Sequence, residues 1–153
     1  MYNKKTDELV NALNGTDIHK IDDFFAENET ELIDEHNPFS GYMRRLFKAH
    51  GVKQQDVFLK ADFSQRYGYR LISGERRTRQ RDYIIRLCLA AGFTLEETQR
   101  ALQIYGMSRL YVRIPRDAAL ISAFQNNVYE ISEVNALLTE KGMTLLKASP
   151  IED

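Results

Sequence analysis

Apolar residues along this chain recur at the spacing of helices, and no alternating run typical of a strand lasts more than a few residues. The segment 17–27, for example, carries one apolar stripe at helical intervals, made of Ile18, Ile21, Phe24 and Phe25. Only three prolines and eight glycines interrupt the 153 residues. The pattern therefore predicts an all-α protein.

Capping and stop residues set the ends of the expected helices. Ser40 is placed to cap a helix that stops at Gly51, and Thr94 with Glu97 has the spacing of a capping box. The tail from Lys147 onward is expected to fray. The expected helices lie at 6–13, 17–27, about 28–35, 40–51, 54–61, 65–72, 79–91, 94–105, 115–126 and 132–142.

Charge divides the chain into regions of opposite sign. Residues 1–37 hold ten acids against three lysines, a net of −7, whereas residues 41–81 hold eleven lysines and arginines against three acids, a net of +8. We therefore expect an acidic helical arm at 1–37, a basic domain at 38–105 and a C-terminal helical extension at 106–153. Two interpretations of the arm stay open: a solvated helical surface, or an arm that folds over the basic face and competes with phosphates.

A helix, a short turn and a second helix stand at the centre of the basic region. Ser64 can cap the second helix, whose outward face would carry glutamine, arginine and tyrosine, the first two being suited to bidentate contacts with base edges. The predicted DNA base contacts are Gln65, Arg66, Tyr69 and Arg70. The predicted phosphate contacts are Lys53, Gln54, Ser64, Arg76, Arg77 and Arg79.

Several landmarks occur in the order of a known family. They are a helix ending at Gly51, Gln54 opening the next, the Ser64 cap, Leu71-Ile72-Ser73-Gly74, and Ala90-Ala91-Gly92-Phe93 before Thr94-Leu95-Glu96-Glu97. Residues 42–102 thereby resemble the Cro/lambda-repressor-like (XRE-type) helix-turn-helix transcriptional regulators. The resemblance implies a five-helix bundle, here with N- and C-terminal helical extensions, and sequence-specific binding of double-stranded DNA, commonly as a homodimer.

Further segments resemble a subgroup of bacterial regulators with acidic N-terminal helices and a C-terminal helical pair, some linked to serine/threonine kinases. These segments are Tyr67-Gly68-Tyr69, Arg81-Asp82, Leu110-Tyr111-Val112-Arg113, Arg116-Asp117-Ala118 and Glu133-Val134-Asn135. The chain departs from the family where Phe58 replaces a small alanine and Gly68 a β-branched residue. We expect these two changes to compensate in volume.

A second function of another class stays open. The same fold could use the surface of Tyr67 and Tyr69, together with the C-terminal helices, to bind a partner protein such as a kinase rather than DNA. The segment 110–113 and the helices after it could likewise serve dimerisation or partner docking, or could simply complete the core.

The sequence gives little support for an enzyme active site or a metal site. The single cysteine, Cys88, lies on the apolar face of its helix, and the three histidines lack the spacing of a helical metal pair. No phosphate loop, nucleophile elbow or kinase motif is present. We therefore expect no enzyme activity, no cofactor and no metal. No apolar run suits a membrane span, and a cytoplasmic location is expected.

Overall fold

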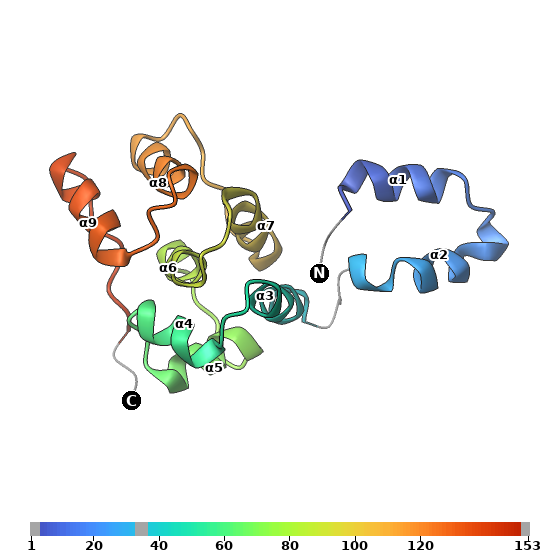
Figure 1. The fold of residues 1–153 in the computed structure, drawn as a ribbon, viewed down its shortest axis with the longest axis horizontal. Helices are drawn as coiled ribbons and strands as arrows, with labels where there is room; N and C mark the ends of the chain where they lie inside the picture. Colours follow the sequence, from blue (N-terminus) through green and yellow to red (C-terminus); the bar gives the residue numbers. More distant parts are fainter. Residues whose placement is uncertain (1–3, 33–36, 151–153) are drawn as a thin grey trace. The chain divides into compact units, whose positions relative to one another are not determined.

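The computed structural model describes residues 4–32 and 37–150, and within these ranges it is helical without strands. The predicted all-α class is thereby confirmed. The chain divides into two compact units, Met1–His36 and Asn37–Asp153. Each is described by itself below, and Figure 1 labels their helices.

Among its described residues, the first unit holds two α-helices and two short 3₁₀ turns. They are α1 (Thr6–Asn14), η1 (Ile18–Lys20), α2 (Ile21–Glu27) and η2 (Glu29–Glu31). Phe24 and Asn28 are its buried side chains among the described residues, and Asn28 donates to the Phe24 carbonyl at 2.9 Å. Part of the turn expected at 28–35 lies outside the described residues. The expected helix at 17–27 is divided, because η1 precedes α2.

The second unit begins with α3 (Pro38–Ala49), which starts earlier than expected. Proline suits the first helical position, and the Asn37 side chain accepts a hydrogen bond from the Ser40 N–H at 3.3 Å. Asn37 is thus the cap, and the prediction that Ser40 caps this helix is wrong. Ser40 instead lies inside the helix and is buried.

Six more helices follow α3 between residues 50 and 150 of the second unit. They are α4 (Gln54–Lys60), α5 (Gln65–Ser73), α6 (Arg81–Ala91), α7 (Leu95–Tyr105), α8 (Pro115–Gln125) and α9 (Ile131–Glu140). The capping box of Thr94 and Glu97 at the start of α7 is confirmed, with both reciprocal hydrogen bonds present. The α6 helix lies at the centre and packs against α4, α7 and α9 (Figure 1).

The helices α8 and α9 complete the core rather than standing apart from it. Leu120, Phe124, Val134 and Leu138 are all buried, and α8 packs on α7 while α9 packs on α6. Of the two interpretations of these helices, completion of the core is the one that their packing supports.

Two reciprocal ion pairs join the start of α6 to the start of α8. Arg81 Nη1 donates to Asp117 Oδ2 at 3.1 Å, and Arg116 Nη2 donates to Asp82 Oδ2 at 2.9 Å. Asp117 is buried, and it also accepts the backbone N–H of Tyr111 at 2.9 Å. These contacts fix the loop before α8 to the rest of the second unit.

The segment after α9 is held by a buried arginine. Arg86 donates to the carbonyls of Lys147 at 2.7 Å, of Leu146 at 3.1 Å and of Ala61 at 3.3 Å. The backbone N–H of Lys147 donates in turn to Asp82 at 2.9 Å. The expectation of a frayed tail is therefore wrong at Lys147, because long-range partners hold its backbone. The last part of that tail, 151–153, lies outside the described residues.

Candidate nucleic-acid interface

The turn between α4 and α5 sets the position of α5. Asp62 has a φ of 62°, in the left-handed region that aspartate tolerates better than most residues. The Ser64 hydroxyl oxygen accepts the backbone N–H of Tyr67 at 3.1 Å, so the predicted cap is confirmed. The Ser64 side chain thus fixes the start of α5. Its hydroxyl hydrogen takes no part in this bond and can donate to another group.

A close contact between Phe58 and Gly68 sets how α4 and α5 pack. Phe58 is fully buried, and a Cβ added at Gly68 would lie within 2.6 Å of three of its ring carbons. The expected compensation between these two residues is confirmed, because the ring fills the space that a side chain at 68 would need. Tyr69 packs its ring edge-on against Phe58, with the centroids 4.9 Å apart.

The predicted base-contacting residues occupy the outer face of α5, but they differ in their exposure and in their contacts with other residues. Gln65, Arg66 and Tyr69 are exposed, and Arg70 is half-buried. The Gln65 side-chain N–H donates to the carbonyl of Gln55 on α4 at 2.9 Å, which orients its amide. Arg70 lies 3.5 Å from the Glu75 carboxylate. Arg70 therefore has an acidic partner of its own within the protein.

Tyr67 lies on the other face of α5. It is buried between Phe63 and Tyr83, and burial raises the pKa of its hydroxyl. Tyr67 is therefore a core residue, and of the two tyrosines proposed as a protein-binding surface only Tyr69 is accessible.

The basic residues between α5 and α6 divide into two kinds. Arg77 donates to the Tyr105 carbonyl at 3.4 Å and lies over the Tyr105 ring at 4.6 Å from its centroid. Its guanidinium is therefore engaged at the end of α7, where it stabilises the link after α5. Arg76 and Arg79 are exposed and reach solvent.

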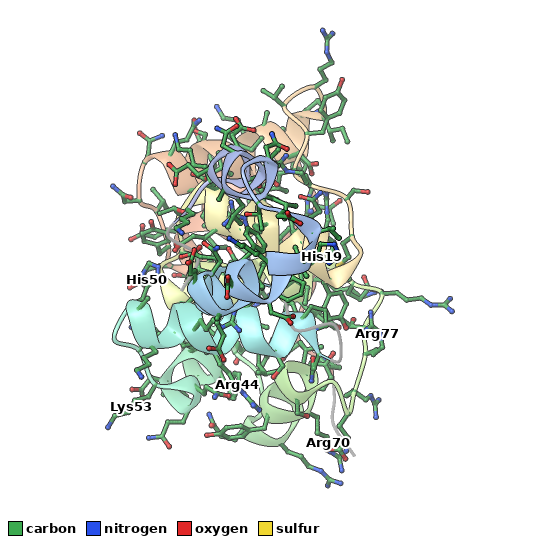
Figure 2. The ribbon with its side chains drawn as sticks, turned by 90° about the vertical axis from the view of Figure 1, so that its right-hand side faces the viewer. His19, Arg44, His50, Lys53, Arg70 and Arg77 are labelled. Atoms are coloured by element: carbon green, nitrogen blue, oxygen red, sulfur yellow. The ribbon has the colours of Figure 1, made fainter. Side chains whose placement is uncertain are left out.

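A hollow of about 550 Å³ lies beside Tyr69, between α3 and the start of α4. Figure 2 shows the labelled Arg44 on α3 and Lys53 just before α4. The side chains around this hollow include three cations and no acid. Its lining residues are Arg44, Phe47, Lys48, Val52, Lys53, Gln54, Gln55 and Tyr69.

The three cationic side chains of this hollow have no partner in the described part of the chain. Among residues 4–32 and 37–150, Arg44, Lys48 and Lys53 make no side-chain hydrogen bond or ion pair. The side-chain carbonyl oxygen of Gln54 is buried without a hydrogen-bond partner in the same part of the chain. Three adjacent cations without a counter-ion attract anions from solution, since their mutual repulsion is otherwise uncompensated.

Arg44 and Lys48 were not among the residues selected from sequence. They lie four residues apart on α3, and so on one face of that helix. The signal was present in this spacing and in the polar character of both positions. What the sequence lacked was the position of Lys53 and Tyr69 next to that face, which depends on how α3, α4 and α5 pack.

The described part of the chain shows neither an accessible thiol nor a cluster of metal-ligating side chains. Cys88 is fully buried, and burial raises the pKa of its thiol to about 12, so its thiolate is scarcely formed at neutral pH. No cluster of three potential metal ligands occurs in residues 4–32 and 37–150. Nor is any helix within those ranges long and apolar enough to cross a membrane.

Comparison of the chain with protein-family models, with curated proteins and with solved structures finds no match.

Proposed function

We propose that this protein binds double-stranded DNA as a transcriptional regulator, with α4 and α5 as a helix-turn-helix and α5 as the recognition helix. The observation that carries the proposal is the cationic hollow of Arg44, Lys48 and Lys53 beside Tyr69. Phosphate contacts supply essentially all of the non-specific affinity of such proteins for DNA and a large share of the specific affinity. A row of unpaired cations next to an exposed helix face is what such contacts require.

We assign side chains to bases or to phosphates from their exposure and from the contacts that they make within the protein. Gln65, Arg66 and Tyr69 face solvent on α5 and are placed for base edges, with Gln65 oriented by its bond to α4. Arg70 would have to leave Glu75 to join them. Phosphates would lie at the hollow and at the exposed Arg76 and Arg79, whereas Arg77 supports the link after α5 through Tyr105.

The five-helix bundle of α3 to α7 is part of the same proposal. In this interpretation α6 is the central helix, and α8 and α9 are an extension that packs on it. No residue is proposed to act in catalysis, and no cofactor or metal is proposed.

Selection from a pool of random DNA duplexes tests this function directly. The full-length protein should enrich one sequence motif over several rounds. Arg66→Ala should relax the preference at one position of that motif, whereas Lys48→Ala should weaken binding to all sequences alike. Recovery of no duplex in any round would refute the proposal.

A second candidate function, the binding of a partner protein, is supported by the loop before α8. Tyr111, Val112 and Ile114 are 52%, 67% and 46% exposed, respectively, and flank the exposed Arg113. The loop is held in shape, because both backbone groups of Leu110 bond to the buried Gln99 side chain, at 2.6 and 2.8 Å. Exposed aromatic and apolar groups on a rigid support are typical of protein interfaces.

Affinity purification with matched variants distinguishes this candidate. A partner that the wild type retains should be lost with Val112→Asp and kept with Leu145→Asp, which places the same charge at another exposed apolar residue. Retention of the same proteins by both variants would exclude the loop as their binding site.

A further inference from the structure

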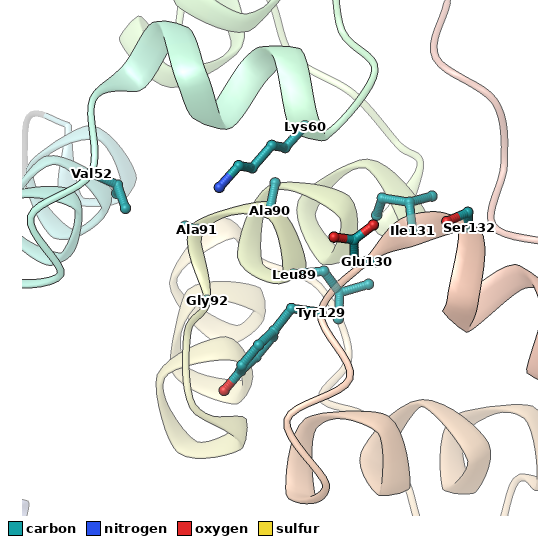
Figure 3. Close-up of a pocket in the computed structure, with 10 residues that line it drawn as sticks. All are labelled: Val52, Lys60, Leu89, Ala90, Ala91, Gly92, Tyr129, Glu130, Ile131 and Ser132. Atoms are coloured by element: carbon teal, nitrogen blue, oxygen red, sulfur yellow. The ribbon is translucent and has the colours of Figure 1, made fainter.

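A second pocket, of about 460 Å³, lies where α4, α6 and the start of α9 meet. Figure 3 shows Lys60 at the end of α4 on one wall, Leu89 to Gly92 at the end of α6 as the floor, and Tyr129 to Ser132 on the other wall. The volume falls in the range of pockets that bind small molecules. All its lining residues belong to the second unit.

The interior of this pocket is mostly apolar. Leu89 and Ala91 are buried core residues that form its floor, and the ring of Tyr129 forms part of its wall. Gly92 has a φ of 72°, and a Cβ built there would meet nothing within 4 Å. The space beside Gly92 is therefore open.

Two opposite charges enter the pocket without pairing. Lys60 and Glu130 both line it, and Figure 3 shows the two side chains extending toward it from opposite walls. Neither side chain makes a hydrogen bond or ion pair with any described residue. An ammonium and a carboxylate that line one apolar pocket without contacting each other define two anchor points of opposite sign.

We propose that this pocket binds a zwitterion with one apolar side chain, of the class of a free hydrophobic α-amino acid. The ligand carboxylate bonds to Lys60, its ammonium bonds to Glu130, and its side chain packs on Leu89 and Tyr129. Charge-assisted hydrogen bonds at both ends fix its orientation, and apolar burial supplies the remaining affinity. The proposal does not depend on DNA binding.

Titration of the full-length, ¹⁵N-labelled protein with L-leucine tests the proposal. The amide resonances of Gly92 and Ile131 should shift in a saturable way. N-acetyl-L-leucine lacks the ammonium and L-leucinamide lacks the carboxylate, so each should bind at least about tenfold more weakly, as expected for one lost charged hydrogen bond.

Variants of Lys60 and Glu130 test which charged group of the ligand each side chain binds. Lys60→Gln should abolish the preference for L-leucine over L-leucinamide, and Glu130→Gln should abolish the preference over N-acetyl-L-leucine. Lys141→Gln and Glu133→Gln remove the same charges from exposed positions outside the pocket and should preserve both preferences. Equal binding of the three compounds, or no saturable shift up to about 10 mM L-leucine, would overturn the proposal.

Discussion

Gly68 on α5 faces the ring of Phe58 on α4 so closely that a methyl group at residue 68 would lie within 2.6 Å of the ring carbons Cγ, Cδ1 and Cδ2. Glycine inside a helix costs about 0.5–1 kcal/mol relative to alanine. Here that cost accompanies a large buried ring, which packs beneath α5 and against Tyr69. The two residues therefore act as one packing unit.

Gly68→Ala should lower the free energy of unfolding by about 1–3 kcal/mol, because the added methyl group overpacks the Phe58 ring. Gly41→Ala is the matched control. Gly41 lies inside α3, and an added Cβ there would meet nothing within 4 Å, so alanine should stabilise the helix by about 0.5–1 kcal/mol. Urea unfolding followed by circular dichroism measures both changes.

Phe58→Leu should restore part of the stability that Gly68→Ala loses. A double-mutant cycle should give a favourable coupling of about 1 kcal/mol or more between the two substitutions. Additive effects would show that the ring and the glycine do not share one space.

The pair of Asp82 and Arg116 predicts a dependence of stability on pH. Burial alone would raise the pKa of Asp82, but hydrogen bonds from Arg116 and from the Lys147 backbone, with the charges of Arg116 and Arg81, outweigh it and hold this pKa below its ordinary value of 3.8. A carboxyl whose pKa is lower in the folded state stabilises the fold above its ordinary pKa. That contribution is lost as the pH falls through the lowered value.

Asp82→Asn should therefore cost about 2 kcal/mol at pH 6 and less at about pH 2.5, because the stabilisation by the charge declines once the pH lies below the ordinary pKa of the carboxyl. Asp56→Asn, at an exposed residue of α4, should cost little at either pH. Urea unfolding at the two pH values provides the comparison. A cost for Asp82→Asn that is the same at both would contradict the role of the charge.

The hydrogen bonds of Arg86 are expected to order the segment after α9. Arg86→Met keeps an apolar stem but removes the donors to the carbonyls of Ala61, Leu146 and Lys147. Backbone amides at 146–147 should then exchange with deuterium at least about tenfold faster, because opening this segment becomes easier. Arg79→Met, at an exposed arginine, should leave the exchange unchanged. Unchanged exchange in both variants would show that other contacts hold the segment.

The charge of the first unit predicts an effect on DNA affinity. Asp22, Asp23 and Glu27 are exposed on α2, and the combined change of Asp22→Asn, Asp23→Asn and Glu27→Gln removes three negative charges from the full-length chain. If the acidic unit competes with phosphates, the duplex affinity should rise a few-fold at low salt, as fluorescence anisotropy would measure. An unchanged affinity would favour the interpretation of this unit as a solvated surface.

The sequence predicted the helices well because their signals are local. The cap at Ser64 and the capping box of Thr94 and Glu97 each need only residues within one turn. The prediction that Ser40 caps α3 was wrong for a local reason too, because Asn37 before a proline is the stronger signal for a helix start. Compensation between Phe58 and Gly68 was predictable because both depart from a known pattern at positions that face each other.

Long-range partners could not be predicted from single residue types. Arg77 looks like Arg76 and Arg79 in sequence, yet it stacks on Tyr105, which is 28 residues away along the chain. Asp82 and Arg86 hold the segment at 146–147 through contacts that only the packing of α6 creates. The hollow formed by Arg44, Lys48 and Lys53 likewise depends on how three helices meet.

The salt dependence of duplex affinity tests the central claim most directly. For the wild type, the logarithm of the binding constant should fall linearly with the logarithm of salt concentration, by about 0.9 for each phosphate contacted. The combined change of Arg44→Gln, Lys48→Gln and Lys53→Gln should reduce this slope by about 2–3 and weaken binding at every salt concentration. The combined change of Arg109→Gln, Arg113→Gln and Lys141→Gln, at exposed residues outside the hollow, should preserve the slope. Equal slopes in all three proteins, or no duplex binding at low salt, would contradict the account.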